Sequence, residues 1–204
     1  VTMLIGMLAG AGWAAIAGYL KAKTGAHEVV STIMLNWIAT YLSSYMVTEP
    51  LAVGSGTPKS PEIAESAKLP PLLTIGATEM TSGIIIAIVA AIIMYIILEK
   101  TTTGYEVKAA GFNPYAAEYG GISISKNITM SMAISGALAG LAGALEVMGV
   151  HHRFLGTLSG GKGFDGISVA LIGQNHPIGI MFAAFLMASL RTGSNEMQFV
   201  GVPK

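Results

Sequence analysis

Long apolar runs separated by short polar segments account for most of the chain. Uninterrupted runs cover residues 2–20, 29–47, 80–98 and 127–147, and each is rich in Leu, Ile, Val, Ala and Met. A helix needs about 20 apolar residues to cross a bilayer core about 30 Å thick. The pattern therefore predicts four membrane-spanning helices over these runs.

A fifth apolar run, 166–190, is interrupted by the sequence Gly-Gln-Asn-His-Pro-Ile-Gly. Pro177 lacks the N–H that a helix interior needs, and Gly173 weakens the turn before it. Residues 166–172 are therefore expected to form a short helix that dips into the membrane, followed by a spanning helix from about Ile178. Broken helices are tolerated in membranes where protein or a water-filled cavity covers the freed backbone.

Small residues recur every four positions in two of the runs. This spacing puts them on one face of a helix, where they allow close approach of a second helix. We therefore expect helix-packing faces at Gly6, Gly10, Ala14 and Gly18, and at Gly136, Gly140 and Ala144.

A polar stretch at 101–126 carries dense signals for helix starts and stops. Thr103 and Glu106 have the spacing of a capping box, in which hydroxyl and carboxylate each satisfy a backbone N–H of the first turn. The helix that follows is expected to stop at Gly111, since glycine readily takes the left-handed conformation after a helix.

A second short helix is expected directly after the first. Asn113 suits the N-cap position and Pro114 the first helical position. Gly120-Gly121 should end this helix, and Ser125 should cap the span that follows. Two short capped helices form a shaped surface, typical of an ordered loop or of a docking element for a partner protein.

Composition supports a membrane protein. Of the 204 residues, 52% are hydrophobic and 11% are charged, whereas soluble domains average about 25% charged residues. The predicted fold class is therefore an all-α polytopic transmembrane bundle with about five spans, in the cell membrane. A formal net charge of zero gives no case for nucleic acid, and the absence of cysteine excludes Cys-based metal sites and nucleophiles.

The ends of the sequence fall within or close to apolar segments. Val1 opens inside the first run, and Val202-Pro203-Lys204 brings no cap or tail. We expect the chain to be a fragment of a longer membrane protein and its residues 1–204 to form one transmembrane domain with a polar loop at 99–126.

Alternation of the five spans gives a topology that the charges can test. With Lys21 and Lys23 inside, the proline-rich loop 49–78 and the His-His segment 150–165 are outside, whereas 99–126 is inside. Six basic residues are then inside (Lys21, Lys23, Lys100, Lys108, Lys126 and Arg191) and four outside (Lys59, Lys68, Arg153 and Lys162). This modest excess agrees with the positive-inside rule and predicts a cytoplasmic 101–126 stretch.

Four polar residues within or beside the spans are candidates for a translocation path. They are Asn36, Glu146, Asp165 and Gln174. An interhelical hydrogen bond is the favoured role for Asn36, and a headgroup-level or paired position for Glu146, so path lining is the second reading for both. Asp165 and Gln174 belong to the interrupted run, where a path is typical of transporters.

Other chemistry finds little support in the sequence. Gly160-Gly161-Lys162-Gly163 lacks the GxxxxGK[ST] spacing of a phosphate loop, so nucleotide binding is excluded there. Adjacent His151 and His152 point in different directions on a helix or a strand, which argues against a metal face. The sequence predicts no catalytic residues, no metal and no cofactor.

Four segments resemble a known family. They are HEVVSTIMLNWIA (27–39), TGYEVKAAGFNPYAAEYGGIS (103–123), SGALAGLAGALEVMG (135–149) and GKGFDGISVALIGQNHPIGI (161–180). In this order they resemble permease subunits of bacterial ABC importers for branched-chain amino acids, simple sugars and nucleosides. The match is closest to the branch for simple sugars and nucleosides, whose partner is a lipoprotein of the basic-membrane-protein type. Family permeases are longer, so the resemblance implies missing helices at both ends.

The resemblance implies a mechanism and a set of partners. Two permease subunits form the path, two ATPases drive it, and an extracellular binding protein delivers a nucleoside or simple sugar. The cytoplasmic loop inserts coupling helices into a groove of an ATPase. The implied interface comprises Gly104, Tyr105, Lys108, Ala109, Gly111, Asn113, Pro114, Ala116, Ala117 and Gly120.

Other functions remain alternatives. Aromatic residues and lysines in 101–126 also suit a role at lipid headgroups. An ion-coupled transporter or a channel would favour several ionisable residues inside spans, of which this chain offers few. An intramembrane enzyme would need a His, Asp, Glu or Ser constellation that the spans lack.

Overall fold

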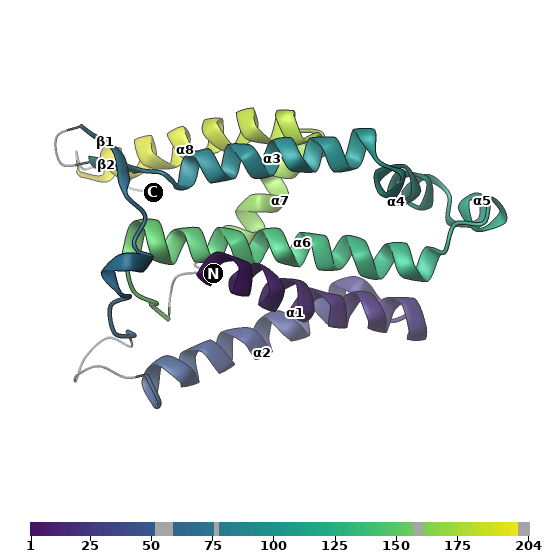
Figure 1. The fold of residues 1–204 in the computed structure, drawn as a ribbon, viewed down its shortest axis with the longest axis horizontal. Coiled ribbons are helices and arrows are strands. Elements are labelled where there is room, and N and C mark those ends of the chain that lie inside the picture. Colours follow the sequence, from purple (N-terminus) through teal and green to yellow (C-terminus); the bar gives the residue numbers. More distant parts are fainter. Residues whose placement is uncertain (52–58, 76–77, 157–160, 200–204) are drawn as a thin grey trace.

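The computed structural model describes residues 1–51, 59–75, 78–156 and 161–199. The long helices α1, α3, α6 and α8 run along the longest axis, with α4 and α5 at one end and a β-hairpin at the other (Figure 1). We call these the α4–α5 end and the hairpin end. The α-helices of the described residues are α1 (Thr2–Thr24), α2 (Glu28–Thr48), α3 (Gly83–Lys100), α4 (Thr102–Phe112), α5 (Pro114–Tyr119), α6 (Ile124–Glu146), α7 (Lys162–Ile172) and α8 (Pro177–Phe199).

Four of these helices are long and apolar enough to span a membrane. They are α1, α3, α8 and α6, the last extended by the π-helical turn η2 (Val147–His151). α2 runs the length of α1 but is less apolar, because Thr, Ser and Asn side chains recur along it. The predicted all-α membrane fold is confirmed, while four of the five expected spans meet this criterion within the described residues.

The closest helix contact joins α1 to α6 in antiparallel orientation. A Cβ atom on Gly140 would lie 2.1 Å from the carbonyl oxygen of Gly6, and one on Gly136 would lie 2.3 Å from that of Gly10. Any larger side chain would push the backbones apart. Both predicted small-residue faces are therefore packing faces, and the structure adds that they face each other.

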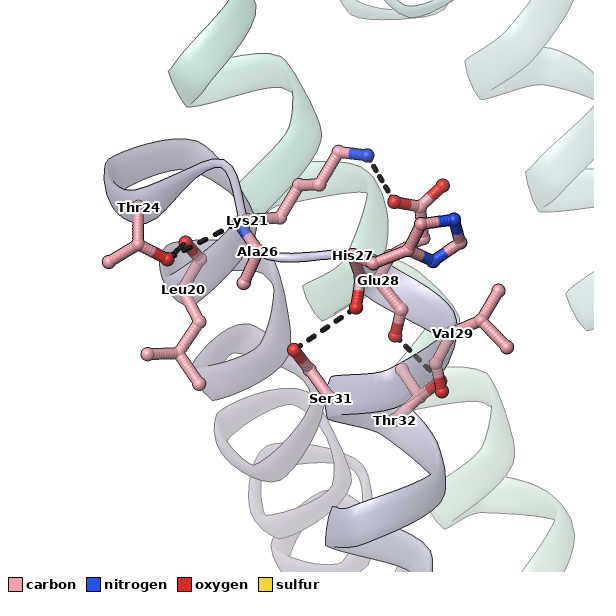
Figure 2. A network of polar contacts seen from close by, with 9 residues as sticks. All are labelled: Leu20, Lys21, Thr24, Ala26, His27, Glu28, Val29, Ser31 and Thr32. Atoms are coloured by element: carbon pink, nitrogen blue, oxygen red, sulfur yellow. Dashed lines mark hydrogen bonds and ion pairs between the residues drawn. The ribbon is translucent and has the colours of Figure 1, made fainter.

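A polar network fixes the turn between α1 and α2 (Figure 2). Gly25 ends α1 with φ 66°, a left-handed conformation that suits glycine. Lys21 forms an ion pair with Glu28 across the turn, and Thr24 Oγ1 donates to the carbonyl oxygen of Leu20 at 2.6 Å. The hydrogen bond from Lys21 lowers the pKa of the Glu28 carboxyl below its ordinary value.

The segment between α2 and α3 contains structure that the sequence did not predict. Within the proline-rich loop 49–78, residues 52–58 and 76–77 lie outside the described residues. The rest includes the 3-10 turn η1 (Glu65–Ala67) and strand β1 (Pro71–Ile75), which pairs antiparallel with β2 (Thr78–Thr81). Because β2 occupies these positions, α3 begins at Gly83 rather than at the predicted residue 80.

Loops from two parts of the chain interlock at the hairpin end. The N–H of Ser60 donates to the carbonyl oxygen of Phe154 at 3.0 Å, and the N–H of Ile63 donates to that of His152 at 2.9 Å. Arg153 also forms an ion pair with Glu62. The proline-rich and His-His segments therefore lie at the same end of the bundle, as alternation of spans predicted.

The interrupted run forms a helical hairpin of α7 and α8. α7 starts at Lys162, four residues before the predicted boundary, and α8 starts at Pro177. α8 then runs back toward the hairpin end, where Arg191 forms an ion pair with Asp165 of α7 (Figure 1). The predicted inside position of Arg191 is therefore wrong, because α7 and α8 enter and leave at the same end.

This correction removes the charge bias used to orient the chain. Moving Arg191 changes six against four basic residues into five against five. The α4–α5 end then carries Lys21, Lys23, Lys100, Lys108 and Lys126. The cytoplasmic placement of this end consequently rests on the family resemblance and not on the charge count.

Substitution of Gly140 tests the α1–α6 contact. Gly140→Leu is expected to destabilise the protein by about 3 kcal/mol or more, since overpacking at a backbone contact cannot be relieved by a side-chain rotation. Thermal unfolding in detergent measures the effect. Gly143→Leu is the matched control, because a Cβ atom there meets nothing within 4 Å. Equal melting temperatures for the two variants would contradict the assignment.

Candidate functional site

One hydroxyl group forms the corner between α3 and α4. Thr101 Oγ1 donates to the carbonyl oxygen of Ile97 at 2.6 Å and accepts from the N–H of Gly104 at 3.2 Å. Thr101 is thus the N-cap of α4 in place of the predicted Thr103, and Glu106 does not complete a capping box. The cap shifts because α3 continues to Lys100 and leaves a single residue for the bend.

The second short helix has the predicted caps. Asn113 Oδ1 accepts from the N–H groups of Tyr115 and Ala116, both at 3.1 Å, and Pro114 occupies the first helical position. Gly120 follows the end of α5, and Gly121 has φ 84°. α4 itself passes the expected stop at Gly111 by one residue, since Asn113 takes over as C-cap. The helix that follows starts at Ile124 after Ser123, so Ser125 lies inside α6 and is not its cap.

The α4–α5 element presents aromatic rings and small residues to its surroundings. Tyr105, Phe112, Tyr115 and Tyr119 are 70–98% exposed. Aromatic side chains of this kind dominate the energetics of protein interfaces. Among the predicted interface residues, the exposed ones are Tyr105, Gly111, Asn113, Pro114, Ala116 and Gly120.

Other predicted interface residues point into the protein. Ala117 is buried. A Cβ atom on Gly104 would lie 2.3 Å from the carbonyl oxygen of Ile97, so this glycine packs α4 onto α3. Lys108 pairs with Glu99 of α3 rather than remaining available to an acid on a partner, and Ala109 is partly buried. These positions hold the element on the bundle, whereas the exposed ones could contact a partner.

The structure brings two of the four path candidates into one charged cluster. Glu146 at the end of α6 pairs with Lys162 at the start of α7, and His151 Nε2 lies 3.4 Å from the same carboxylate. One turn later on α7, Asp165 pairs with Arg191 of α8. The paired reading favoured for Glu146 is confirmed. The cluster ties α6, α7 and α8 together in the half of the bundle near the hairpin end.

The other two path candidates lie elsewhere. Gln174 sits in the tight turn between α7 and α8, nine residues beyond Asp165, or roughly 14 Å along a helix. It is exposed and has φ 54°, and Asn175 beside it has φ 55°. Asn36 is exposed on α2, and its amide makes no hydrogen bond to another helix among the described residues, contrary to the favoured reading.

A family model for the permease component of branched-chain amino acid transport systems matches residues 1–201. The chain belongs to this permease family. The match covers α1 to α8, including the α4–α5 element and the α7–α8 hairpin, so this permease chain is an integral membrane protein.

Three relatives indicate which transporters the permease chain is similar to. It is 41% identical to a guanosine ABC transporter permease of Bacillus subtilis (strain 168) over the whole chain and 59% of that protein. It is 40% identical to a nucleoside ABC transporter permease of Lactococcus lactis subsp. cremoris (strain MG1363) over the whole chain and 58% of the relative. A glucose ABC transporter permease of Haloferax volcanii is 32% identical over 98% of the chain and 55% of the relative.

The permease chain therefore spans somewhat more than half the length of these relatives. No solved structure shows significant similarity to it. Within the described residues, no group of three or more His, Asp or Glu side chains could hold a metal ion.

Several functional contacts of the permease chain escaped sequence reasoning. The Asp165–Arg191 pair was hidden because the residues were assigned to a single pass across the membrane. Glu106 donates no cap and instead accepts a hydrogen bond from Asn127 of α6. A lone Asn at the start of an apolar helix was the available signal for that contact.

The N-cap of α5 provides a stability test. Asn113→Ala is expected to cost about 1 kcal/mol, because two N–H groups of the first turn lose their acceptor. Amide hydrogen exchange of Tyr115 and Ala116, measured by mass spectrometry of the permease in detergent, reports the loss locally. Asn113→Asp keeps the acceptor and should leave exchange unchanged; faster exchange in this variant as well would refute a capping role.

A charge exchange tests the link between α7 and α8. Asp165→Arg should place two cations side by side and lower the melting temperature, while the double variant Asp165→Arg/Arg191→Asp should recover much of the loss. The pair is about half exposed, so the single effect is expected to be modest, about 1 kcal/mol. Additive losses in the double variant would show that the two side chains do not interact.

Proposed function

We propose that the chain is part of the permease subunit of an ABC importer that carries nucleosides across the cell membrane. The observation that carries this proposal is about 40% identity to nucleoside permeases from two organisms along the entire chain. The capped α4–α5 element supports it, because a rigid element with exposed aromatic rings suits the transmission of force from a partner.

The proposal assigns the α4–α5 element to contact with an ATPase subunit. Tyr105, Phe112, Tyr115 and Tyr119 would be the apolar anchors, and the small exposed residues Gly111 and Ala116 would let the partner approach closely. The buried Gly104 and Ala117 would hold the element in place. ATP hydrolysis would occur in the partner, and a second permease subunit and an extracellular solute-binding lipoprotein would complete the importer.

The proposed translocation path passes the α7–α8 hairpin. A helix that ends inside a membrane exposes backbone and polar side chains, which persist there where a path or protein covers them. Gln174 at the turn is exposed and polar, which supports contact with substrate. Glu146 and Asp165 would shape the entrance through their ion pairs, and Asn36 on α2 is the weakest candidate because it lies on an outer face.

A simple sugar is the second candidate substrate, favoured by the 32% identity to a glucose permease. Uptake of radiolabelled guanosine and glucose by cells that carry or lack the intact transporter distinguishes the two. Guanosine uptake that depends on the permease, and that excess glucose does not reduce, is expected. Permease-dependent uptake of glucose alone would replace the nucleoside with a sugar.

An ion-coupled transporter is the alternative class. Uptake through such a protein would persist when ATP is depleted and would fall when the ion gradient is collapsed. The importer proposed here should show the opposite response in vesicles loaded with or without ATP.

A charge at the centre of the exposed surface tests the coupling role. Ala116→Glu should place a desolvated carboxylate in the ATPase contact and lower ATP-driven guanosine uptake at least tenfold, the scale of one unpaired buried charge. Ser125→Glu, an exposed position at the start of α6, is the matched control. Membrane levels of both variants should equal those of the wild type; full uptake by Ala116→Glu would refute the coupling role.

Single cysteines test the orientation, and the chain has no native cysteine to interfere. Cysteines at Ala64 and Val150, both exposed at the hairpin end, should react with an impermeant thiol reagent on intact cells. A cysteine at Tyr119, at the other end, should react only after lysis. The reverse pattern would invert the proposed topology.

A further inference from the structure

Asn127 is a buried polar residue at the start of α6. Its side chain is 2% exposed, and its Nδ2 donates to Glu106 Oε2 and to the carbonyl oxygen of Ser123, both at 3.1 Å. The two neighbours are acceptors, so only the Nδ2 end of the amide can face them. The hydrogen bond to Glu106 therefore joins α4 to α6 in one defined geometry.

This contact is not optimised for stability. Asn127 Oδ1 is buried and has no hydrogen-bond partner among the described residues. An unpaired buried acceptor destabilises the folded state, and an apolar side chain of similar size often improves it. A role beyond folding is the better explanation for an amide at this position.

The remaining contacts of α4 hold it to α3. Gly104 packs against the carbonyl oxygens of Ile97 and Leu98, and Lys108 pairs with Glu99. α6, in turn, is locked to α1 through Gly136 and Gly140. The Glu106–Asn127 hydrogen bond is the side-chain hydrogen bond between these two units within the described residues.

We propose that Glu106 and Asn127 are positioning residues that transmit displacement of the α4–α5 element to α6. This inference rests on the proposed function, in which an ATPase moves α4 and α5. The joint acts on the first turn of α6, so it pulls on one end of a rigid helix. A charged acceptor and an amide donor keep the two helices in register while their apolar surroundings slide.

The far end of α6 carries the displacement to the hairpin. Glu146 lies 19 residues beyond Asn127, about 29 Å along the helix axis, and pairs with Lys162 at the start of α7. A tilt of α6 at Asn127 would therefore move the entrance of the α7–α8 hairpin. The joint links the ATPase-facing element to the proposed path without either residue contacting substrate.

The ratio of transport to ATP hydrolysis tests the joint. The complete transporter, reconstituted in proteoliposomes, is assayed for radiolabelled guanosine imported per ATP hydrolysed, and the melting temperature is measured in parallel. Asn127→Leu should lower the ratio about tenfold, the scale of a hydrogen bond to a charged group, while its melting temperature stays equal or rises. Because the ratio is taken per ATP hydrolysed, a smaller amount of assembled protein does not change it.

Two further variants separate transmission from folding. Glu106→Gln keeps an acceptor for Asn127 and should retain more than half of the wild-type ratio, whereas Glu106→Leu should lose it as Asn127→Leu does. Ser131→Ala is the matched control, because this hydroxyl bonds only to Ile128 of its own helix. Its ratio should equal that of the wild type.

The outcomes distinguish this inference from the function on which it rests. A wild-type ratio in both Asn127→Leu and Glu106→Leu would overturn the joint and leave the importer intact. Equal losses in Glu106→Gln and Glu106→Leu would also overturn it, because the acceptor would then be irrelevant. Wild-type vesicles that import neither guanosine nor glucose with ATP would overturn the proposed function and the joint together.

Discussion

Backbone contact between α1 and α6 is the constraint on which the rest of the bundle depends. Apolar side chains contact lipid as readily as one another, so helices in a membrane gain little from the hydrophobic effect and associate through close packing. Here the absence of side chains at Gly10, Gly136 and Gly140 brings two backbones together. α2 packs on this pair, and α6 offers its first turn to α4 and its last turn to α7. Much of the remaining apolar surface, including that of α3, is exposed, as expected for a surface that faces lipid or other helices.

The two candidate functional regions obey different physical rules. The α4–α5 element is ordered by local capping: Thr101 and Asn113 satisfy N–H groups that would otherwise need water. The α7–α8 hairpin is ordered by charge pairs, in which Lys162 and Arg191 compensate Glu146 and Asp165. Compensation matters more near a membrane, where an unpaired carboxylate is costly. The first region is therefore shaped to be touched, and the second is shaped to tolerate polar groups beside lipid.

Features with a local cause could be predicted from the sequence, and features that depend on distant partners could not. The glycine faces, the caps of α5 and the break before Pro177 follow from residue type and spacing. The Thr101 cap was missed because it depends on how far α3 extends. The position of Arg191 was wrong because nothing in a single apolar run reveals that its two halves double back. The β-hairpin and the Glu106–Asn127 bond join segments whose pairing no periodicity encodes.

The corner at Thr101 leaves no slack between α3 and α4, because α3 ends at Lys100 and α4 begins at Thr102. The rotational phase of α4 is therefore inherited from α3. An inserted residue would turn the following helix by about 100° about its axis, which would carry Tyr105 and Phe112 to another side and Glu106 away from Asn127. The length of the α3–α4 connection is in this sense part of the interface: loops elsewhere in the chain can gain residues at little cost, whereas this one sets which side chains a partner meets.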